Sequence, residues 1–116
     1  MSKVIFDKLL ELLASTALTS GANGTGKLVG PTGLIKGVVV VTAASGTDPT
    51  LDVHFEESDD DSTYTDIPGA AVPQFTTTGL KEVYFKATKK YVRHVHAVGG
   101  TSPSFTTQVL LTTPEK

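Results

Sequence analysis

Three histidines are the strongest candidates for metal chemistry in this sequence. His94 and His96 are two residues apart, so on a strand their imidazoles would face the same side and could hold one metal ion between them. His54 could supply a third ligand. No further His or Glu at a suitable spacing completes the set, and the basic residues within 89–93 are typical of an exposed or interface surface. We therefore expect these histidines to hold no metal.

An acidic run at 59–61, followed by Asp66, is the second candidate for chemistry. Clustered carboxylates are ligands that Ca²⁺ prefers, but the run lacks the glycine and the distal glutamate of an EF-hand loop. Hydrolysis of a sugar by a pair of these carboxylates would need a cleft with aromatic walls, and the chain has no Trp. Asp and Ser readily form hydrogen bonds within turns, so the pattern favours a solvated β-turn.

The stretch GANGTGKL, residues 21–28, has the glycine and lysine spacing of a phosphate-binding loop. That loop needs a strand before it, a helix after it, and a Ser or Thr after the lysine to hold Mg²⁺. Here Leu28 takes the position of the hydroxyl, and the VGPTG that follows cannot open a helix. The sequence therefore predicts a flexible connector and not a nucleotide site.

No pattern for nucleophilic catalysis accompanies these residues. The chain has no Cys and no G-x-S-x-G elbow, so we expect a protein that is not an enzyme and uses no cofactor. A net charge of −2 without a basic run argues against nucleic acid as a partner. The longest apolar runs are too short to cross a membrane, and residues 1–20 lack the build of a signal peptide.

The elements that must carry these residues are strands. Among 116 residues there are 18 Thr and 13 Val, and clusters of Gly, Pro and Asp separate the apolar runs. Period-two patterns predict short strands at 34–44, 50–57, 64–67, 71–77, 82–88, 90–98 and 105–113. We predict an all-β domain over residues 34–116, a single β-sandwich or small jelly-roll-like barrel of about seven strands.

The first 33 residues have a different pattern. Residues 4–13 place apolar side chains at helical spacing, which predicts a short amphipathic helix or an ordered arm within residues 1–20. Residues 21–33 are small, polar and glycine-rich, as in a linker. We expect the β-domain to fold without residues 1–20 and the tethered apolar stripe to bind a partner through Ile5, Phe6, Leu9, Leu10, Leu12 and Leu13.

Three stretches carry a resemblance to a known class of protein. They are TLDVHFEESDDDSTYTDIPGAA, KKYVRHVHAVGGTSPSF and TQVLL, and the likeness covers roughly residues 34–112. In these stretches the chain resembles small β-sandwich virion proteins of tailed bacteriophages, most of all capsid decoration (cement) proteins. The shared features are turn and strand signatures and not catalytic motifs.

The resemblance implies a non-enzymatic structural protein, made in the host bacterial cytoplasm and located on the outer capsid surface. Its partners would be the major capsid protein and other copies of itself, with a trimer as one possible oligomer. Two other readings remain open. One is a tail or fibre module that binds another virion protein or host-surface carbohydrate, for which the available aromatic residues are Tyr64, Tyr84 and Tyr91. The other is a metal-dependent enzyme that uses the three histidines.

Overall fold

The computed structural model describes residues 9–29 and 33–112. Within these residues the chain forms seven strands and no helix, and so it contains no helix long and apolar enough to cross a membrane. The expected all-β class is confirmed. The total of seven strands equals the expected number, but three of them lie within 9–29, where an arm and a linker were expected, and only four lie within 33–112. The strands are β1 (Leu9–Leu18), β2 (Ala22–Asn23), β3 (Lys27–Leu28), β4 (Gly33–Ser58), β5 (Thr65–Phe75), β6 (Gly79–Ala87) and β7 (Tyr91–Thr112).

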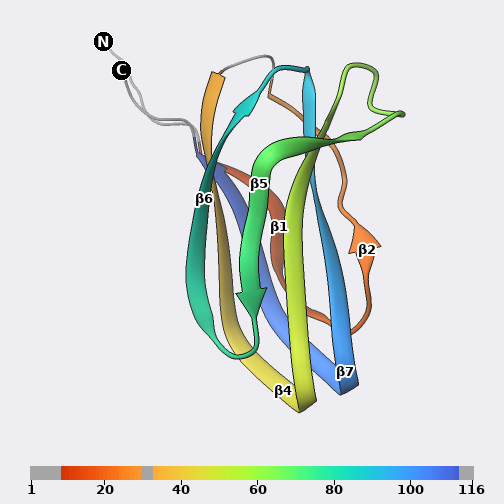
Figure 1. Cartoon of the computed structure of the whole chain (residues 1–116), viewed down its shortest axis with the longest axis vertical. Coiled ribbons are helices and arrows are strands. Elements are labelled where there is room, and N and C mark those ends of the chain that lie inside the picture. The colour runs from red at the N-terminus through yellow and green to blue at the C-terminus, as the bar shows by residue number, and fades with distance from the viewer. Residues whose placement is uncertain (1–8, 30–32, 113–116) are drawn as a thin grey trace.

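Two long strands, β4 and β7, double back on themselves and so build both layers of a sandwich (Figure 1). Residues 33–45 of β4 pair with β6 on one side and with residues 104–112 of β7 on the other. Residues 50–58 pair instead with β5 and with residues 91–99 of β7. The first layer therefore has the strand order β1–β7–β4–β6. In the second layer, β7 and β4 lie between β5 on one side and the short strands β2 and β3 on the other.

The two long strands bend at the same corner, where their backbones lie against each other. Gly46 and Asp48 in β4, and Gly100 and Ser102 in β7, all have positive φ angles, of 113°, 49°, 106° and 50°. A Cβ on Gly46 would lie 2.8 Å from the carbonyl oxygen of Ser102, and one on Gly100 would lie 2.7 Å from that of Asp48. Both bends therefore need glycine, for the backbone angle and for the close approach.

The core lies between the two layers and follows the alternation of the strands. Leu51, Val53 and Phe55 of β4 are buried, as the period-two pattern predicts. Across the layers the ring of Phe55 stacks on that of Phe85 in β6, with 5.0 Å between ring centroids. A Cβ on Gly37 would lie 2.8 Å from the Phe55 ring, so the absent side chain makes the space that this ring fills.

The predicted N-terminal helix is wrong for the residues that the structure describes, because Leu9–Leu18 form a strand. β1 pairs antiparallel with residues 105–112 of β7, and Leu12 and Leu18 are buried in the core. A helix this short is marginal in water, whereas the edge of β7 offers a ladder of backbone hydrogen bonds and an apolar layer. Since β1 completes one layer, we no longer expect the β-domain to fold without residues 1–20.

The predicted linker is also partly wrong. β2 and β3 lie within residues 21–33, and both pair with β7. Backbone hydrogen bonds from Gly24 N to His94 O (2.7 Å) and from Val29 N to Lys90 O (2.8 Å) continue this contact. Residues 22–29 therefore run along the edge of β7 and do not form a free tether.

Replacing Gly37 tests whether the Phe55 ring fills that space. We expect Gly37→Ala to lower the free energy of unfolding by about 1–3 kcal/mol, because the new methyl overpacks the core. Urea denaturation followed by circular dichroism measures the change. The control is Lys36→Ala, whose side chain faces outward in a partly exposed ion pair with Glu82 and should matter by less than about 0.5 kcal/mol. Equal stability of Gly37→Ala and the wild type would contradict the packing argument.

Candidate functional site

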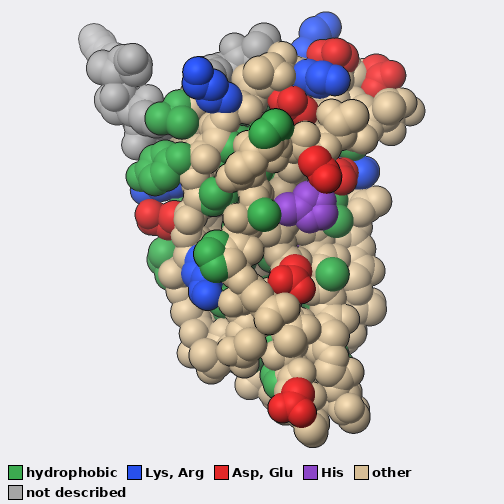
Figure 2. Space-filling model, viewed as in Figure 1, with side chains coloured by type: hydrophobic (Ala, Val, Ile, Leu, Met, Phe, Trp, Pro, Cys, Tyr) green, Lys and Arg blue, Asp and Glu red, His purple; other side chains and the backbone are tan. Residues whose placement is uncertain are grey.

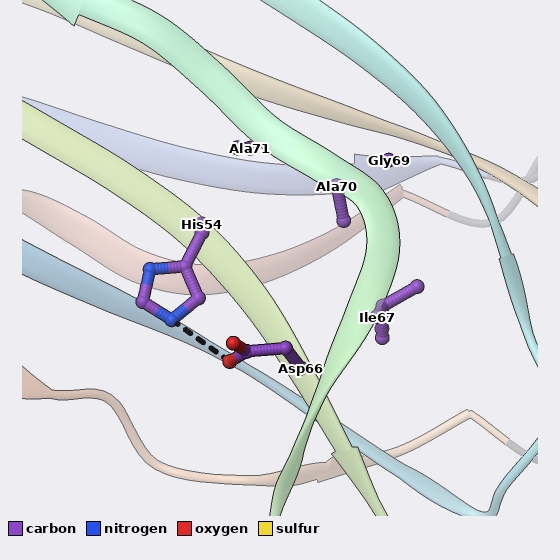
Figure 3. A pocket seen from close by; sticks show the side chains of 6 residues that line it. All are labelled: His54, Asp66, Ile67, Gly69, Ala70 and Ala71. Carbon is purple, nitrogen blue, oxygen red and sulfur yellow. Dashed lines mark ion pairs between the residues drawn. The ribbon is translucent and has the colours of Figure 1, made fainter.

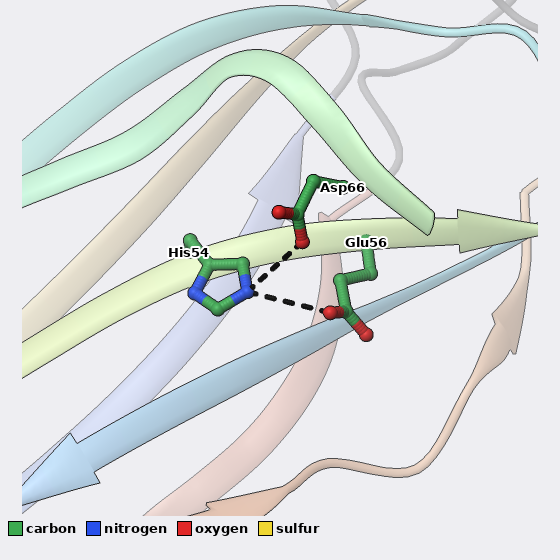
Figure 4. A group of neighbouring side chains, drawn as sticks. All are labelled: His54, Glu56 and Asp66. Atoms are coloured by element: carbon green, nitrogen blue, oxygen red, sulfur yellow. Dashed lines mark hydrogen bonds and ion pairs between the residues drawn. The ribbon is translucent and has the colours of Figure 1, made fainter. Parts of the chain in front are cut away.

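A cluster of charged side chains lies on the outer face of the second layer, where β4 passes between β5 and β7. Glu56 of β4 is opposite Arg93 of β7 on one side and opposite Asp66 of β5 on the other. His54, two residues earlier, faces the same side because strand side chains alternate. His54 Nε2 lies 3.4 Å from Glu56 Oε2 and 3.3 Å from Asp66 Oδ1 (Figure 4).

A bulge in β5 makes a hollow beside this cluster. His54 is opposite Ala71 and Glu56 is opposite Asp66, so β5 places four residues, 67–70, against one residue of β4. Gly69 takes the positive φ of 76° that this bulge needs. The hollow has a volume of about 310 Å³, and it is lined by His54, Asp66, Ile67, Gly69, Ala70 and Ala71 (Figure 3).

Arg93 fixes one side of the cluster. Its Nε and Nη2 donate to Glu56 Oε1 at 2.9 and 2.7 Å, and its guanidinium stacks 4.0 Å from the ring centroid of Tyr64. Burial acts to raise the pKa of Glu56, but hydrogen bonds from Arg93 and His54 outweigh it, and the pKa is lowered. Glu56 is therefore ionised at neutral pH, and its second oxygen, Oε2, points toward His54.

The acidic run at 59–61 forms the turn beside the cluster, as its composition predicts. Asp60 Oδ1 accepts hydrogen bonds from Ser58 Oγ and from the backbone N–H groups of Ser62 and Thr63, at 2.9–3.0 Å. Asp61 accepts a hydrogen bond from the Tyr64 hydroxyl; burial, followed by this carboxylate, raises the pKa of Tyr64 to about 12. The structure therefore separates Asp66, which joins His54, from the run that the sequence grouped with it.

His94 and His96 point to the interior, away from His54. His54 is opposite Val95 in the β4–β7 ladder, so the flanking histidines of β7 face the other side of the sheet. Both are buried, and their rings stack with centroids 5.1 Å apart. The candidate grouping of the three histidines is therefore not formed, and the expectation that His94 and His96 lie on an exposed or interface surface is wrong.

Hydrogen bonds fix the proton positions of the pair. Ser20 O can only accept, so His96 Nε2 carries a proton and donates to it at 3.1 Å. In a neutral ring, His96 Nδ1 then accepts from His94 Nε2 at 2.9 Å. This leaves His94 Nδ1 unprotonated and buried without a partner. Burial, with the neighbouring His96, lowers the pKa of His94 to about 4, and burial also lowers that of His96.

The glycines of residues 21–28 are explained by what they cover. A Cβ on Gly24 would collide with the His94 ring, and one on Gly26 would collide with the Tyr64 hydroxyl. The stretch lies between β1 and β4, with no helix after β3 among the described residues. The phosphate-loop spacing therefore reflects close packing of this segment against β7 and the 58–64 turn.

The six predicted partner-binding residues differ in where the structure places them. Ile5 and Phe6 lie outside the described residues, and Leu9 and Leu10 lie in β1. Leu12 is buried and Leu13 packs against the core, so these two side chains serve the chain's own sandwich.

Exposed apolar side chains gather instead on the outer side of the first layer. Leu34 of β4 and Leu80 and Tyr84 of β6 are 46%, 58% and 56% exposed. The pairs Lys36–Tyr84 and Val40–Leu80 place all three on one face, here called the β4–β6 face. Hydrophobic side chains are visible at the side of the molecule where β6 lies (Figure 2).

No protein-family model and no curated protein matches this sequence. Solved structures do match the fold. YomS, a protein derived from the SPBc2 prophage, is similar over 97% of this chain and 100% of its own, with a TM-score of 0.55 and 13% identity. The PBSX exported protein XepA is similar over 94% of this chain and 38% of its own, with a TM-score of 0.64 and 20% identity.

The VP2 subviral particle of infectious bursal disease virus is similar over 92% of this chain and 32% of its own, with a TM-score of 0.56 and 16% identity. The chain thus spans all of YomS but less than two fifths of XepA or VP2. A Clostridium thermocellum xylanase solved with xylohexaose matches with a TM-score of 0.55. These likenesses establish a β-sandwich fold shared with phage-derived and viral capsid proteins, and they assign no activity.

Reasoning from the sequence missed the cluster of His54, Glu56 and Asp66. The signal for two members was present, because alternation puts His54 and Glu56 on one face of their strand. Asp66 joins them because it pairs with Glu56 beside the 58–64 turn, and that register between the strands is not encoded in any local pattern.

The buried histidine pair predicts a dependence of stability on pH. The unfolded chain takes up a proton on His94 near pH 6.5 and the folded chain only near pH 4, so stability is lost as the pH falls between these values. We expect the free energy of unfolding to drop by about 2 kcal/mol from pH 7 to pH 5 through His94 alone. Denaturation of the wild type at both values measures the drop.

His94→Leu should make this drop distinctly smaller, because the titrating group is gone, whereas His54→Gln should retain it. A drop of unchanged size in His94→Leu would assign the pH dependence to other groups.

Proposed function

We propose that this protein is a non-enzymatic structural component of a phage virion. It decorates and stabilises the capsid by binding major capsid protein subunits and neighbouring copies of itself. The observation that carries the proposal is the β4–β6 face, where three large apolar side chains are exposed on one side of the sheet, two of them on the edge strand β6. The fold shared with prophage-derived and viral capsid proteins supports it.

Exposed apolar groups of this kind mark surfaces that bind other proteins. Among the described residues β6 pairs only with β4, so its second edge also presents free backbone groups to a partner strand. Lys36 and Glu82 form an ion pair of 3.5 Å within the same face, which adds a polar contact at its centre. A capsid offers many identical copies of one surface, so modest contacts at each copy add up.

This proposal moves the expected partner surface from the N-terminal residues to the β4–β6 face. Leu12 and Leu13 are engaged in the core, and a side chain that packs within its own domain is not free to bind a capsid.

Co-sedimentation with expanded, DNA-free capsid shells tests the proposal. We expect saturable binding of the wild type at a fixed ratio to the major capsid protein. Leu80→Glu should weaken it by about thirtyfold, the size of effect that removal of one strongly contributing contact residue has. The matched control is Leu28→Glu, since Leu28 is 66% exposed on β3 and lies outside the face. If the wild type shows no saturable binding, the decoration role is wrong. If Leu80→Glu and Leu28→Glu bind equally well, the β4–β6 face is not the interface.

A tail or fibre module that binds carbohydrate is the second candidate. Tyr84 is exposed on the β4–β6 face and could stack on a sugar ring, whereas the ring of Tyr64 is covered by Arg93. A glycan array separates the two candidates: sugar binding that Tyr84→Ala abolishes, together with no binding to shells, would favour the tail or fibre module.

A further inference from the structure

The cluster of His54, Glu56 and Asp66 has the arrangement of a metal site. One ligand atom from each residue lies within 4.8 Å of the other two. His54 Nε2 lies 3.4 Å from Glu56 Oε2 and 3.3 Å from Asp66 Oδ1. Ligand atoms about 2.1 Å from a tetrahedral zinc ion are about 3.4 Å from each other. The His54 nitrogen therefore lies at a suitable separation from each of the two carboxylate oxygens to share such an ion with them.

We propose that His54, Glu56 and Asp66 bind one divalent transition metal ion of the Zn²⁺ type. One imidazole nitrogen and two carboxylate oxygens suit such an ion, while Ca²⁺ takes six to eight oxygen ligands and Mg²⁺ prefers six. Arg93 also offsets the negative charge of Glu56. This weakens the electrostatic attraction for Ca²⁺ or Mg²⁺, which depend on carboxylate charge, more than for a Zn²⁺-type ion, which the imidazole nitrogen also binds.

The surroundings orient the ligands and leave the ion accessible. Arg93 holds Glu56 Oε1 with two hydrogen bonds, which leaves Oε2 for the metal, as outer partners of metal-binding carboxylates do. The side chains of His54 and Asp66 are 37% and 77% exposed, and both line the hollow under the 67–70 bulge. A bound ion would thus link β4 to β5 beside the bulge and keep one position open to water.

The simpler alternative is an ion pair between a protonated His54 and the two carboxylates. It involves the same distances but leaves no affinity for a metal. The other two histidines do not compete for the ion, because three of their four ring nitrogens are involved in hydrogen bonds to each other and to Ser20 O, and His94 Nδ1 is buried under Gly24. The site stands apart from the β4–β6 face, so its test does not depend on the capsid role.

Calorimetric titration of the tag-free, chelator-treated protein with Zn²⁺, and visible absorption with Co²⁺, test the site. We expect one ion per chain, with Co²⁺ bands that Zn²⁺ displaces. His54→Gln and Asp66→Asn should each weaken binding by roughly tenfold or more. The matched control is Asp59→Asn, which removes the same charge from the exposed neighbouring turn and should bind like the wild type.

Thermal denaturation without metal shows which variants are folded, and with Zn²⁺ it gives a second readout. The ion should raise Tm for the wild type and for Asp59→Asn, and by much less for His54→Gln and Asp66→Asn. The proposal is overturned if neither ion binds the wild type at millimolar concentration, or if folded His54→Gln binds Zn²⁺ as tightly as the wild type.

Discussion

The shared bend of β4 and β7 is the constraint on which this sandwich depends. Each strand reverses across the same corner, and each bend is tight enough that a Cβ on Gly46 or Gly100 would collide with the other strand. Because the ladder between the strands continues on both sides of the corner, one pair of strands forms the centre of both layers. The positions of β1, β5 and β6 follow from this pair, since each adds to an edge that it leaves open.

The sequence predicts the strands well where the pattern is local. The breaks expected between the strands at 34–44 and 50–57, and between those at 90–98 and 105–113, fall at the two bends. The alternation of 50–57 correctly assigns Leu51, Val53 and Phe55 to the core. Residues 9–13 were misread as helical because leucine spacing alone does not reveal that an edge of β7, about a hundred residues away, is available. In this segment, pairing with a distant strand overrides the local helical preference of the sequence.

The same limit applies to the charged cluster and to the glycine-rich stretch. Pairing of β4 with β5 beside the 58–64 turn brings Asp66 to Glu56 and His54, and the bulge that makes the neighbouring hollow contains only the short signal IPGA at 67–70. The glycines of 21–28 have motif-like spacing, but the spacing arises from two separate contacts, one with His94 and one with Tyr64. Spacing along the chain identifies a site only when the partners of those residues are known.

The central place of β7 has a consequence for how the chain is made. β7 begins at Tyr91, yet it is the strand on which β1, β2, β3 and both halves of β4 depend for pairing. Until β7 has emerged from the ribosome, the nascent chain exposes apolar strands and has neither layer in complete form. Such long-range pairing is slow and leaves open edges to aggregate. The domain therefore folds as a whole only after β7 has been made, and it is most prone to aggregate in the interval before β7 emerges.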